Sequence, residues 1–180
     1  MTASFRLRRA GPEDAALLSR LKVAIFRLTY RDLLPAEMLR ALGPDDPYSG
    51  VAAWRRRLLD EGEDIQVIEV GEPVGYSAVV RPSPPFAGAH AVIDQLYLLP
   101  AWQGSRTAQA LWRATTEALP RPFGLSAFEG NYRARRFYEG RGGRVAGHLV
   151  EFYHRGQPFH EVIYMFDDAP SAHPLRRMIR

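Results

Sequence analysis

The sequence of 180 residues contains no cysteine. Disulfide bonds, thiolate metal ligands and cysteine nucleophiles are therefore excluded, and nothing points to an oxidising compartment. Residues 1–10 lack the apolar core of a signal peptide, and no run approaches the roughly 20 apolar residues of a membrane span. We therefore expect a cytoplasmic protein without a membrane partner.

Lysine is almost absent as well. Lys22 is the only lysine, whereas arginine occurs 23 times, and the formal net charge is +4. Planar guanidinium groups favour anionic ligands. The densest group of arginines, within residues 133–144, is too short for a nucleic-acid footprint, so we expect no nucleic-acid partner. The five histidines show no metal-ligand spacing, and we expect no metal.

The first third of the chain has the pattern of one strand followed by helices. Apolar and basic residues alternate over residues 5–9, which is typical of a strand. Gly11-Pro12-Glu13-Asp14 then starts a helix, with proline in its first turn and acids at its positive end. Further helices are predicted at residues 33–42 and 51–59.

The rest of the chain alternates between short β-rich runs and helices. Two runs joined at Gly71-Glu72-Pro73 have the spacing of a hairpin, and a largely apolar run that stops at Pro100 is typical of a buried strand. The strands predicted after residue 60 are 65–70, 74–80, 91–98, 123–127, 145–153 and 159–166, and the helices are 104–119 and 131–139.

This order predicts an α/β protein. Its central sheet should be mixed and mostly antiparallel, with about seven strands flanked by helices and a parallel crossover in its second half. A chain of this length can bury a core without metal or disulfide support. We expect a single domain over residues 1–166 and a polar, poorly anchored tail over residues 167–180.

Residues 131–143 are the most informative stretch. Asn131 and Tyr138 lie seven residues apart, about 20° short of two helical turns, so their side chains share one face of a helix. Asn131 can cap the N-terminus of that helix, and the glycines that follow it can end it. Taken alone, the stretch also fits a capped amphipathic helix that buries Ala134, Phe137 and Tyr138.

The segment after the apolar strand resembles the signature of the GNAT superfamily of N-acetyltransferases. That signature has Gln or Arg, two residues, Gly, one residue, and then Gly or Ala. Gln103 and Ala108 stand at its first and last positions, whereas Arg106 stands where the family usually has glycine. A second family motif, an Asn and a Tyr on one helix after the next strand, matches Asn131 and Tyr138. The resemblance covers nearly the whole chain.

The resemblance implies acetyl-CoA as cosubstrate. A loop leading into a helix N-terminus offers unpaired N–H groups to a pyrophosphate, and a strand edge pairs with an extended pantetheine arm. Arg106 has opposing effects there, because its side chain crowds the loop while its charge attracts phosphate, so we expect weakened but retained binding. The implied cofactor-binding residues are Leu96, Tyr97, Leu98, Gln103, Gly104, Ser105, Arg106, Thr107, Ala108 and Asn131, the last as a pantetheine contact or only as the helix cap.

In the acetyl transfer of this family an amine attacks the thioester directly, so no covalent nucleophile is needed. By the resemblance, Tyr138 would protonate the leaving thiolate; its alternative role is a buried aromatic. Val92 stands where several relatives carry a glutamate base. Asp94, expected on the same strand face as Val92 and Leu96, is the candidate base through a water, although a strand aspartate that merely meets an arginine is an open alternative. Further candidates are Glu129 and His90.

The leading hypothesis is an N-acetyltransferase that moves acetyl from acetyl-CoA to an amine of a small molecule or peptide within a ternary complex. The alternative is a non-catalytic acyl-CoA sensor or interaction domain with a degenerate pyrophosphate loop. A homodimer is an expectation from the family only. The acceptor pocket would be formed by the first two helices, loop 82–88 and the closing hairpin, with Phe26, Tyr30, Tyr76, Phe86 and Tyr153 as its candidate aromatic lining.

Overall fold

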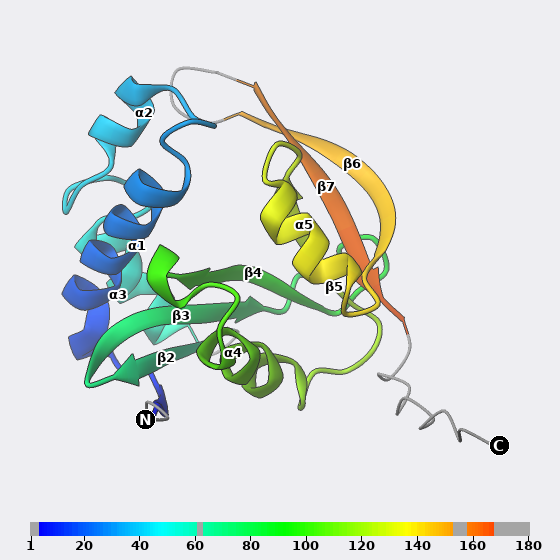
Figure 1. The fold of residues 1–180 in the computed structure, drawn as a ribbon, viewed down its shortest axis with the longest axis horizontal. Helices are drawn as coiled ribbons and strands as arrows, with labels where there is room; N and C mark the ends of the chain where they lie inside the picture. Colours follow the sequence, from blue (N-terminus) through cyan, green and yellow to red (C-terminus); the bar gives the residue numbers. More distant parts are fainter. Residues whose placement is uncertain (1–3, 61–62, 153–157, 168–180) are drawn as a thin grey trace, which may run out of the picture.

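Seven strands form one sheet in the computed structural model, which describes residues 4–60, 63–152 and 158–167. The strands are β1 (Arg6–Arg9), β2 (Asp64–Val70), β3 (Glu72–Val80), β4 (Ala91–Leu98), β5 (Phe123–Phe128), β6 (Arg144–Phe152) and β7 (Pro158–Phe166). Their order is β1-β2-β3-β4-β5-β7-β6, and every neighbouring pair except β4 and β5 is antiparallel (Figure 1). The predicted mixed, mostly antiparallel sheet is confirmed.

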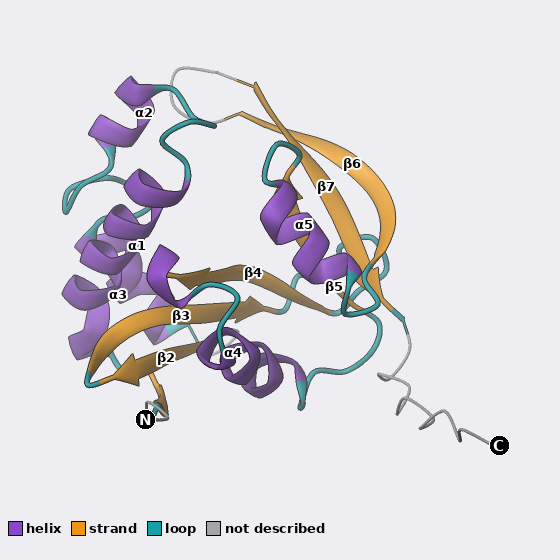
Figure 2. Cartoon of the chain, viewed as in Figure 1, coloured by secondary structure: helices purple, strands orange, loops and turns teal. Residues whose placement is uncertain are grey.

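Helices cover both faces of the sheet (Figure 2). They are α1 (Ala15–Thr29), α2 (Ala36–Ala41), α3 (Val51–Leu59), α4 (Arg106–Thr116) and α5 (Tyr132–Glu139), with 3₁₀ turns at Pro12–Asp14 and Pro100–Trp102. Ile65 and Val67 of β2 pack with α1 and α3, whereas Ile68, on the opposite face, packs with α4. α5 lies on the side of α4, because the rings of Trp112 and Tyr138 are in contact. The central strands are therefore apolar on both faces.

α3 has its predicted bounds, and the other helices lie close to their predicted positions with shorter ends. α4 spans Arg106–Thr116 rather than 104–119, because the Ser105 side chain caps it by accepting hydrogen bonds from the N–H groups of Thr107 and Ala108. A helical start at Pro12 is confirmed, although its first turn is 3₁₀. Residues 168–180 of the expected tail, and Tyr153 in the closing hairpin, lie outside the described residues.

β4 carries a bulge at Asp94. The register with β3 shifts between Ile93 and Gln95, which leaves Asp94 without a direct partner. As a result Ile93 and Leu96 both pack on the side of α4 and α5, whereas Asp94 accepts a hydrogen bond from Arg57 of α3. The expectation that Asp94 and Leu96 share a face is therefore wrong, because an inserted residue breaks the alternation on which it rested.

β4 and β5 stay together over only three pairs of residues, from Ala91 with Phe123 to Ile93 with Leu125. Beyond Ile93, β4 continues beside β3 and β5 continues beside β7. Within the described residues, the edge of β4 that faces β5 therefore has no strand partner from Asp94 to Leu98. α4 makes the crossover between these two parallel strands, as the sequence predicts.

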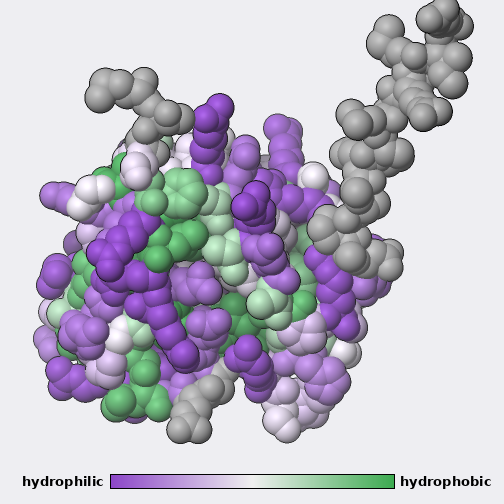
Figure 3. Space-filling model, turned by 90° about the horizontal axis from the view of Figure 1, so that it is seen from below, coloured by the Kyte–Doolittle hydropathy of each residue, from purple (hydrophilic) through white to green (hydrophobic). Residues whose placement is uncertain are grey.

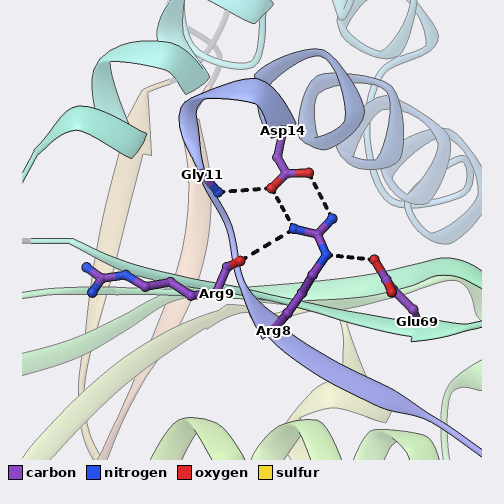
Figure 4. A network of polar contacts seen from close by, with 5 residues as sticks. All are labelled: Arg8, Arg9, Gly11, Asp14 and Glu69. Carbon is purple, nitrogen blue, oxygen red and sulfur yellow. Dashed lines mark hydrogen bonds and ion pairs between the residues drawn. The ribbon is translucent and has the colours of Figure 1, made fainter.

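A network of charges joins β1, β2 and the entry to α1 (Figure 4). The Arg8 guanidinium donates to the two carboxylate oxygens of Asp14 at 2.6 and 2.8 Å and to Glu69 at 2.8 Å. Asp14 also accepts from the N–H of Gly11 at 2.9 Å. Hydrogen bonding from Arg8 holds the pKa of Asp14 below its usual range. The network therefore fixes the first strand to the first helix.

Polar and charged residues project over the face shown in Figure 3, which views the molecule from below. Hydrophobic residues form separate areas between them on that face. Exposed large apolar side chains occur at scattered places along the described chain, such as Leu59 and Tyr132. Among the helices of these residues, none has the length and apolar character that a bilayer crossing requires.

Replacing Asp14 by asparagine should lower the free energy of unfolding by about 2 kcal/mol at pH 7, because Arg8 loses a charged partner in a partly buried site. The folded pKa of Asp14 lies below its unfolded value, so this contribution is present at neutral pH and is lost as the pH falls through the folded pKa. Urea unfolding at pH 7 and pH 3 measures the difference, which should shrink at pH 3. The control is Asp32→Asn, which removes a surface pair with Arg31. Equal differences at both pH values would contradict the prediction.

Candidate active site

A cavity of about 640 Å³ lies where β4 and β5 separate. Its walls come from α1, β4, β5 and α5, and the loop between β4 and α4 adds a further part. Most of the predicted site residues meet here: Asp94, Leu96, Tyr97, Leu98, Gln103, Gly104, Ala108, Asn131 and Tyr138 line it, whereas Ser105, Arg106 and Thr107 do not.

The loop that leads into α4 presents a run of backbone donors. Gly104 has a φ of 74°, so the conformation that favours glycine falls here and not at Arg106. Ser105 Oγ accepts from the N–H groups of Thr107 and Ala108. The N–H groups of Gly104, Ser105 and Arg106 have no hydrogen-bond partner among the described residues. Three successive donors at the positive end of a helix can bind an anionic group such as a phosphate.

Arginines surround this loop. The Arg106 side chain is exposed and lies outside the cavity lining, so it does not crowd the donors. Arg133 of α5 reaches across the loop and donates to the carbonyl of Gln103 at 3.0 Å. Arg133 and Arg136 both line the cavity. The sequence motif does not contain these two, and their place in the arginine-rich stretch is the only signal that could have found them.

Gln103 holds the loop in position. Its Nε2 donates to the carbonyl of Leu98 at 3.0 Å and to the hydroxyl of Thr29 at 3.4 Å, which ties the loop to the end of β4 and to α1. Thr107 and Ala108 are buried, and Ala108 packs in the cluster between α4 and the sheet. These three residues therefore fix the position of the donors, and Gln103 and Ala108 also form part of the cavity wall.

Asn131 caps α5, as one of its two expected roles requires. Its Oδ1 accepts from the N–H of Ala134 at 3.2 Å, and its Nδ2 donates to the hydroxyl of Tyr30 at 3.4 Å. Burial raises the pKa of Tyr30 to about 12. The cap thus connects the start of α5 with the end of α1 through a tyrosine that also lines the cavity.

Tyr138 is only 8% exposed, yet it forms part of the cavity wall. Its hydroxyl makes no hydrogen bond within the described part of the chain. Its ring packs against Trp112 and Tyr164, with centroids 5.9 Å away in both cases. Burial raises the pKa of Tyr138 well above the ordinary value of 10.0, so the phenol stays protonated at physiological pH. It is a proton donor that no neighbouring group has engaged.

The sequence profile described as the acetyltransferase (GNAT) family matches residues 27–143. The chain belongs to the GNAT acetyltransferase family. It is therefore an acyltransferase. A comparison with curated protein sequences gives no significant match.

Solved acetyltransferase structures share the fold. A GCN5-related N-acetyltransferase from Rhodopseudomonas palustris has a TM-score of 0.72 at 21% identity, covering 93% of this chain and 98% of that one. PaiA N-acetyltransferase from Thermoplasma acidophilum, solved with coenzyme A, has a TM-score of 0.68 at 14% identity, covering 88% and 98%. The spermidine/spermine N-acetyltransferase SpeG from Vibrio cholerae, in mutant forms, has a TM-score of 0.59 at 20% identity, covering 91% and 94%.

Asp94 is already engaged in the acetyltransferase structure. Its Oδ2 accepts from Arg57 at 2.7 Å and from Nε2 of Gln95 at 3.1 Å. The alternative interpretation, in which the Asp94 side chain pairs with an arginine, therefore agrees with its contacts in the structure. The bulge nevertheless places Asp94 in the wall of the cavity. Its carboxylate is thus held in place at the site by a fixed cation.

Glu161 of β7 is a second cavity carboxylate, and sequence reasoning missed it. It is 7% exposed and accepts a hydrogen bond from Ser126 Oγ of β5. The apolar pattern of β7 gave no signal for it, because its role depends on β5 lying next to β7. Glu151 of β6 also lines the cavity. The further base candidates Glu129 and His90 do not.

A second cavity, of about 1200 Å³, is lined by α1, α2 and the loop at residues 42–49. The two cavities have four lining residues in common, which are Phe26, Asp94, Tyr97 and Glu151. The two cavities therefore meet at these residues, and a ligand can reach the site by two routes. One passes along β4 and the loop before α4, and the other passes between the first two helices, where an acceptor pocket was expected.

Two of the expected pocket aromatics, Phe26 and Tyr30, line the first cavity, and Phe26 also lines the second; their role in an acceptor pocket stays a prediction. Tyr76 is not one of them, because it is fully buried in the core and its hydroxyl donates to Gln95 at 2.8 Å. Phe86 lines neither cavity, and the same holds for the rest of loop 82–88. The fifth candidate, Tyr153, lies outside the described residues.

Lys22 extends from α1 into the second cavity. Its Nζ lies 5.6 Å from the ring centroid of Phe26 and 5.9 Å from that of Trp54, both within cation–π range. Burial, and to a lesser degree the charge of Arg57, lower the pKa of Lys22 to about 8, although Asp94 and Asp46 act in the opposite direction. The only lysine of the chain therefore has a pKa below its ordinary value.

The Lys22 ammonium should lose its proton near pH 8 in the folded protein, against 10.5 for an ordinary lysine. Since the chain has one lysine, protein labelled with ¹³Cε-lysine gives a single side-chain resonance, whose shift against pH measures this pKa directly. Stability should rise between about pH 8 and 10.5, because the unfolded chain binds the additional proton there. A titration midpoint near 10.5 in the folded state would contradict the prediction.

Proposed function

We propose that the protein is an acetyl-CoA-dependent N-acetyltransferase that acts on an amine of a small molecule or a peptide. The observation that carries the proposal is the opening between β4 and β5. The cavity there has Gly104 and the unbonded phenol of Tyr138 in its wall, the backbone donors of residues 104–106 lie at the loop before α4, and β4 has no strand neighbour on the side of β5 beyond Ile93. Anion binding, an extended ligand and proton donation are the three features that this reaction requires.

The chain offers a consistent set of contacts for acetyl-CoA. The N–H groups of Gly104, Ser105 and Arg106 would receive the pyrophosphate, with Arg133 and Arg136 as nearby cations. The backbone of β4 at Leu96, Tyr97 and Leu98, which does not pair with β5, would pair with the pantetheine arm, as strand edges do with extended ligands. The coenzyme A in the PaiA acetyltransferase structure supports this assignment. Acetyl-CoA supplies the activated acetyl group.

Direct transfer within a ternary complex fits the residues present. The amine nitrogen attacks the thioester carbonyl, a C–N bond forms, and the C–S bond breaks. Tyr138 donates its proton to the leaving sulfur. The proton released by the amine passes through a water to Asp94, which Arg57 holds at the cavity wall. The sequence contains no cysteine, and this route needs no covalent intermediate on the protein.

The acceptor would enter through the second cavity, which meets the first at Phe26, Asp94 and Tyr97. An amine at this junction has Asp94 beside it. The spermidine/spermine acetyltransferase among the similar structures supports an amine acceptor in general terms. A degenerate loop is not favoured as a basis for a non-catalytic sensor, because Arg106 is exposed and is not one of the residues that line the cavity.

Acetyl-CoA or CoA at millimolar concentration should raise the melting temperature by several degrees, because ligand that binds only the folded state stabilises it by about 2.7 kcal/mol at 100 times its Kd. Arg133→Ala should weaken the apparent affinity about threefold to tenfold through loss of a partly exposed cation. Arg113→Ala, on the exposed side of α4 and outside the cavity, is the matched control. Differential scanning fluorimetry measures all three proteins, and absence of any shift in the unmodified protein would refute acetyl-CoA binding.

Tyr138→Phe should lower kcat about 100-fold while leaving CoA affinity unchanged, because it removes the proton donor and keeps the packed ring. The assay uses acetyl-CoA and the best amine from an acceptor screen. Tyr132→Phe, on the same helix and 66% exposed, is the control and should keep full activity. An unchanged kcat in Tyr138→Phe, with CoA still bound, would remove the proposed acid and leave an acyl-CoA-binding role.

A further inference from the structure

The ammonium group of Lys22 has no hydrogen bond and no ion pair among the described residues. Its contacts are cation–π interactions with the rings of Phe26 and Trp54. A half-buried ammonium needs acceptors for three N–H groups, and aromatic rings satisfy this need only in part. A charge of this kind costs folding stability unless something outside the chain supplies the missing acceptors.

The carboxylates that influence Lys22 are committed to other groups. Asp94 accepts from Arg57 and Gln95, and Asp46 accepts from the N–H and the hydroxyl of Ser49 at 2.6 and 2.7 Å. The Asp46 carboxylate therefore stabilises the loop before α3.

The core beside Lys22 holds a further donor without a partner. Nε1 of Trp54 is the only buried side-chain nitrogen or oxygen without a partner in the described part of the chain. Trp54 is also the ring beside which Lys22 lies. Trp54 is 1% exposed and lines neither cavity, so of these two donors only the Lys22 ammonium can meet a ligand, and the neighbouring carboxylates already accept from other groups. A ligand that binds beside Lys22 must therefore bring a hydrogen-bond acceptor, and the charge of Lys22 favours a negatively charged acceptor.

Position along α1 connects Lys22 with the reaction centre. Lys22 precedes Phe26 by four residues, so the two share a helix face and are about 6 Å apart along the axis. Phe26 and Asp94 line both cavities. A group bound by Lys22 would therefore lie in the same cavity as the junction where the reacting amine is expected. Lys22 and Asp94 together present a cation and an anion to one small molecule.

We infer that Lys22 binds an acidic group on the amine acceptor, so that the substrates are amines carrying a carboxylate or a phosphate close to the reacting nitrogen, such as free amino acids. This inference rests on the proposed acetyltransferase function, because it names the acceptor of that reaction. The acidic group completes the hydrogen bonding of the ammonium, and the amine is directed towards Asp94. A simple amine without the acidic group leaves Lys22 unsatisfied and binds more weakly.

A test that does not depend on turnover uses the single ¹³Cε-lysine resonance in protein saturated with CoA. The probes are matched pairs: glycine and methylamine, L-methionine and 3-(methylthio)propylamine, L-phenylalanine and phenethylamine, and O-phosphoethanolamine and ethanolamine. The acidic member of at least one pair should shift the resonance and move its pH midpoint upward from about 8, since an anion stabilises the charged form. The first three pairs report a carboxylate and the fourth reports a phosphate. Equal responses within every pair, or no response to any acidic member at 50 mM, would overturn the inference.

Kinetics supply a second measurement. Lys22→Met keeps the apolar contacts of the side chain, and it should raise KM at least tenfold for the acidic amine while leaving KM for acetyl-CoA unchanged. Discrimination between the two members of the pair should fall by the same factor. Arg20→Met, an exposed cation on the same helix and outside both cavities, should change neither value. Unchanged discrimination in Lys22→Met would overturn the inference even if the variant is fully folded.

The two levels of the proposal fail separately. If CoA does not stabilise the unmodified protein, the acetyl-CoA assignment itself is wrong. If CoA stabilises the protein and amines are acetylated, but acidic and neutral members of each pair behave alike, only the role of Lys22 is wrong.

Discussion

β4 and β5 are neighbours over Ala91–Ile93 and then separate, and the whole site depends on this separation. A parallel pair that continued to Leu98 would have used the backbone groups of β4 and closed the cavity. Since β5 stays with β7, the two halves of the sheet open like a wedge, as the ribbon in Figure 1 shows. α4 and α5 then bring their N-termini to the rim of the opening. Ligand binding is thus a consequence of strand pairing that stops early.

Helix ends supply most of the polar chemistry around this opening. Ser105 satisfies two N–H groups of α4 and leaves the three preceding donors free. Asn131 satisfies α5 and at the same time reaches Tyr30 at the end of α1. Because the capping side chains already satisfy N–H groups in the first turns of α4 and α5, the remaining donors can bind a ligand without destabilising either helix. The phenol of Tyr138 is available as well. The positions of the caps therefore decide which groups face a ligand.

Arg57 organises the charges on the other side of β4. It pairs with Glu63 and Asp94 at 2.7 Å each and lies over the ring of Trp54. Its charge holds Asp94 in place and, together with the larger effect of burial, lowers the pKa of the neighbouring Lys22. One guanidinium thus links α3 to the bulge of β4 and sets the electrostatic character of the junction between the cavities. The ion pair of Arg57 with Asp94 fixes a carboxylate at the junction, whereas the Lys22 ammonium has no ion pair among the described residues. In the proposed reaction Asp94 would accept the proton of the amine, and Lys22 would bind the acidic group of the same substrate.

The order of elements, the parallel crossover, the cap at Asn131 and the place of Tyr138 could be predicted from the sequence, because helix caps and periodicity act within a few residues. The bulge at Asp94, the exposed position of Arg106, and the approach of Arg133, Glu161 and Lys22 to the cavities could not. Each depends on which strand lies beside which, and on partners 30 or more residues away in the chain, such as Gln103 for Arg133 and Ser126 for Glu161. Local pattern therefore determined the elements and many of the residues that line the candidate site, while tertiary packing decided which charges are paired and which face a ligand.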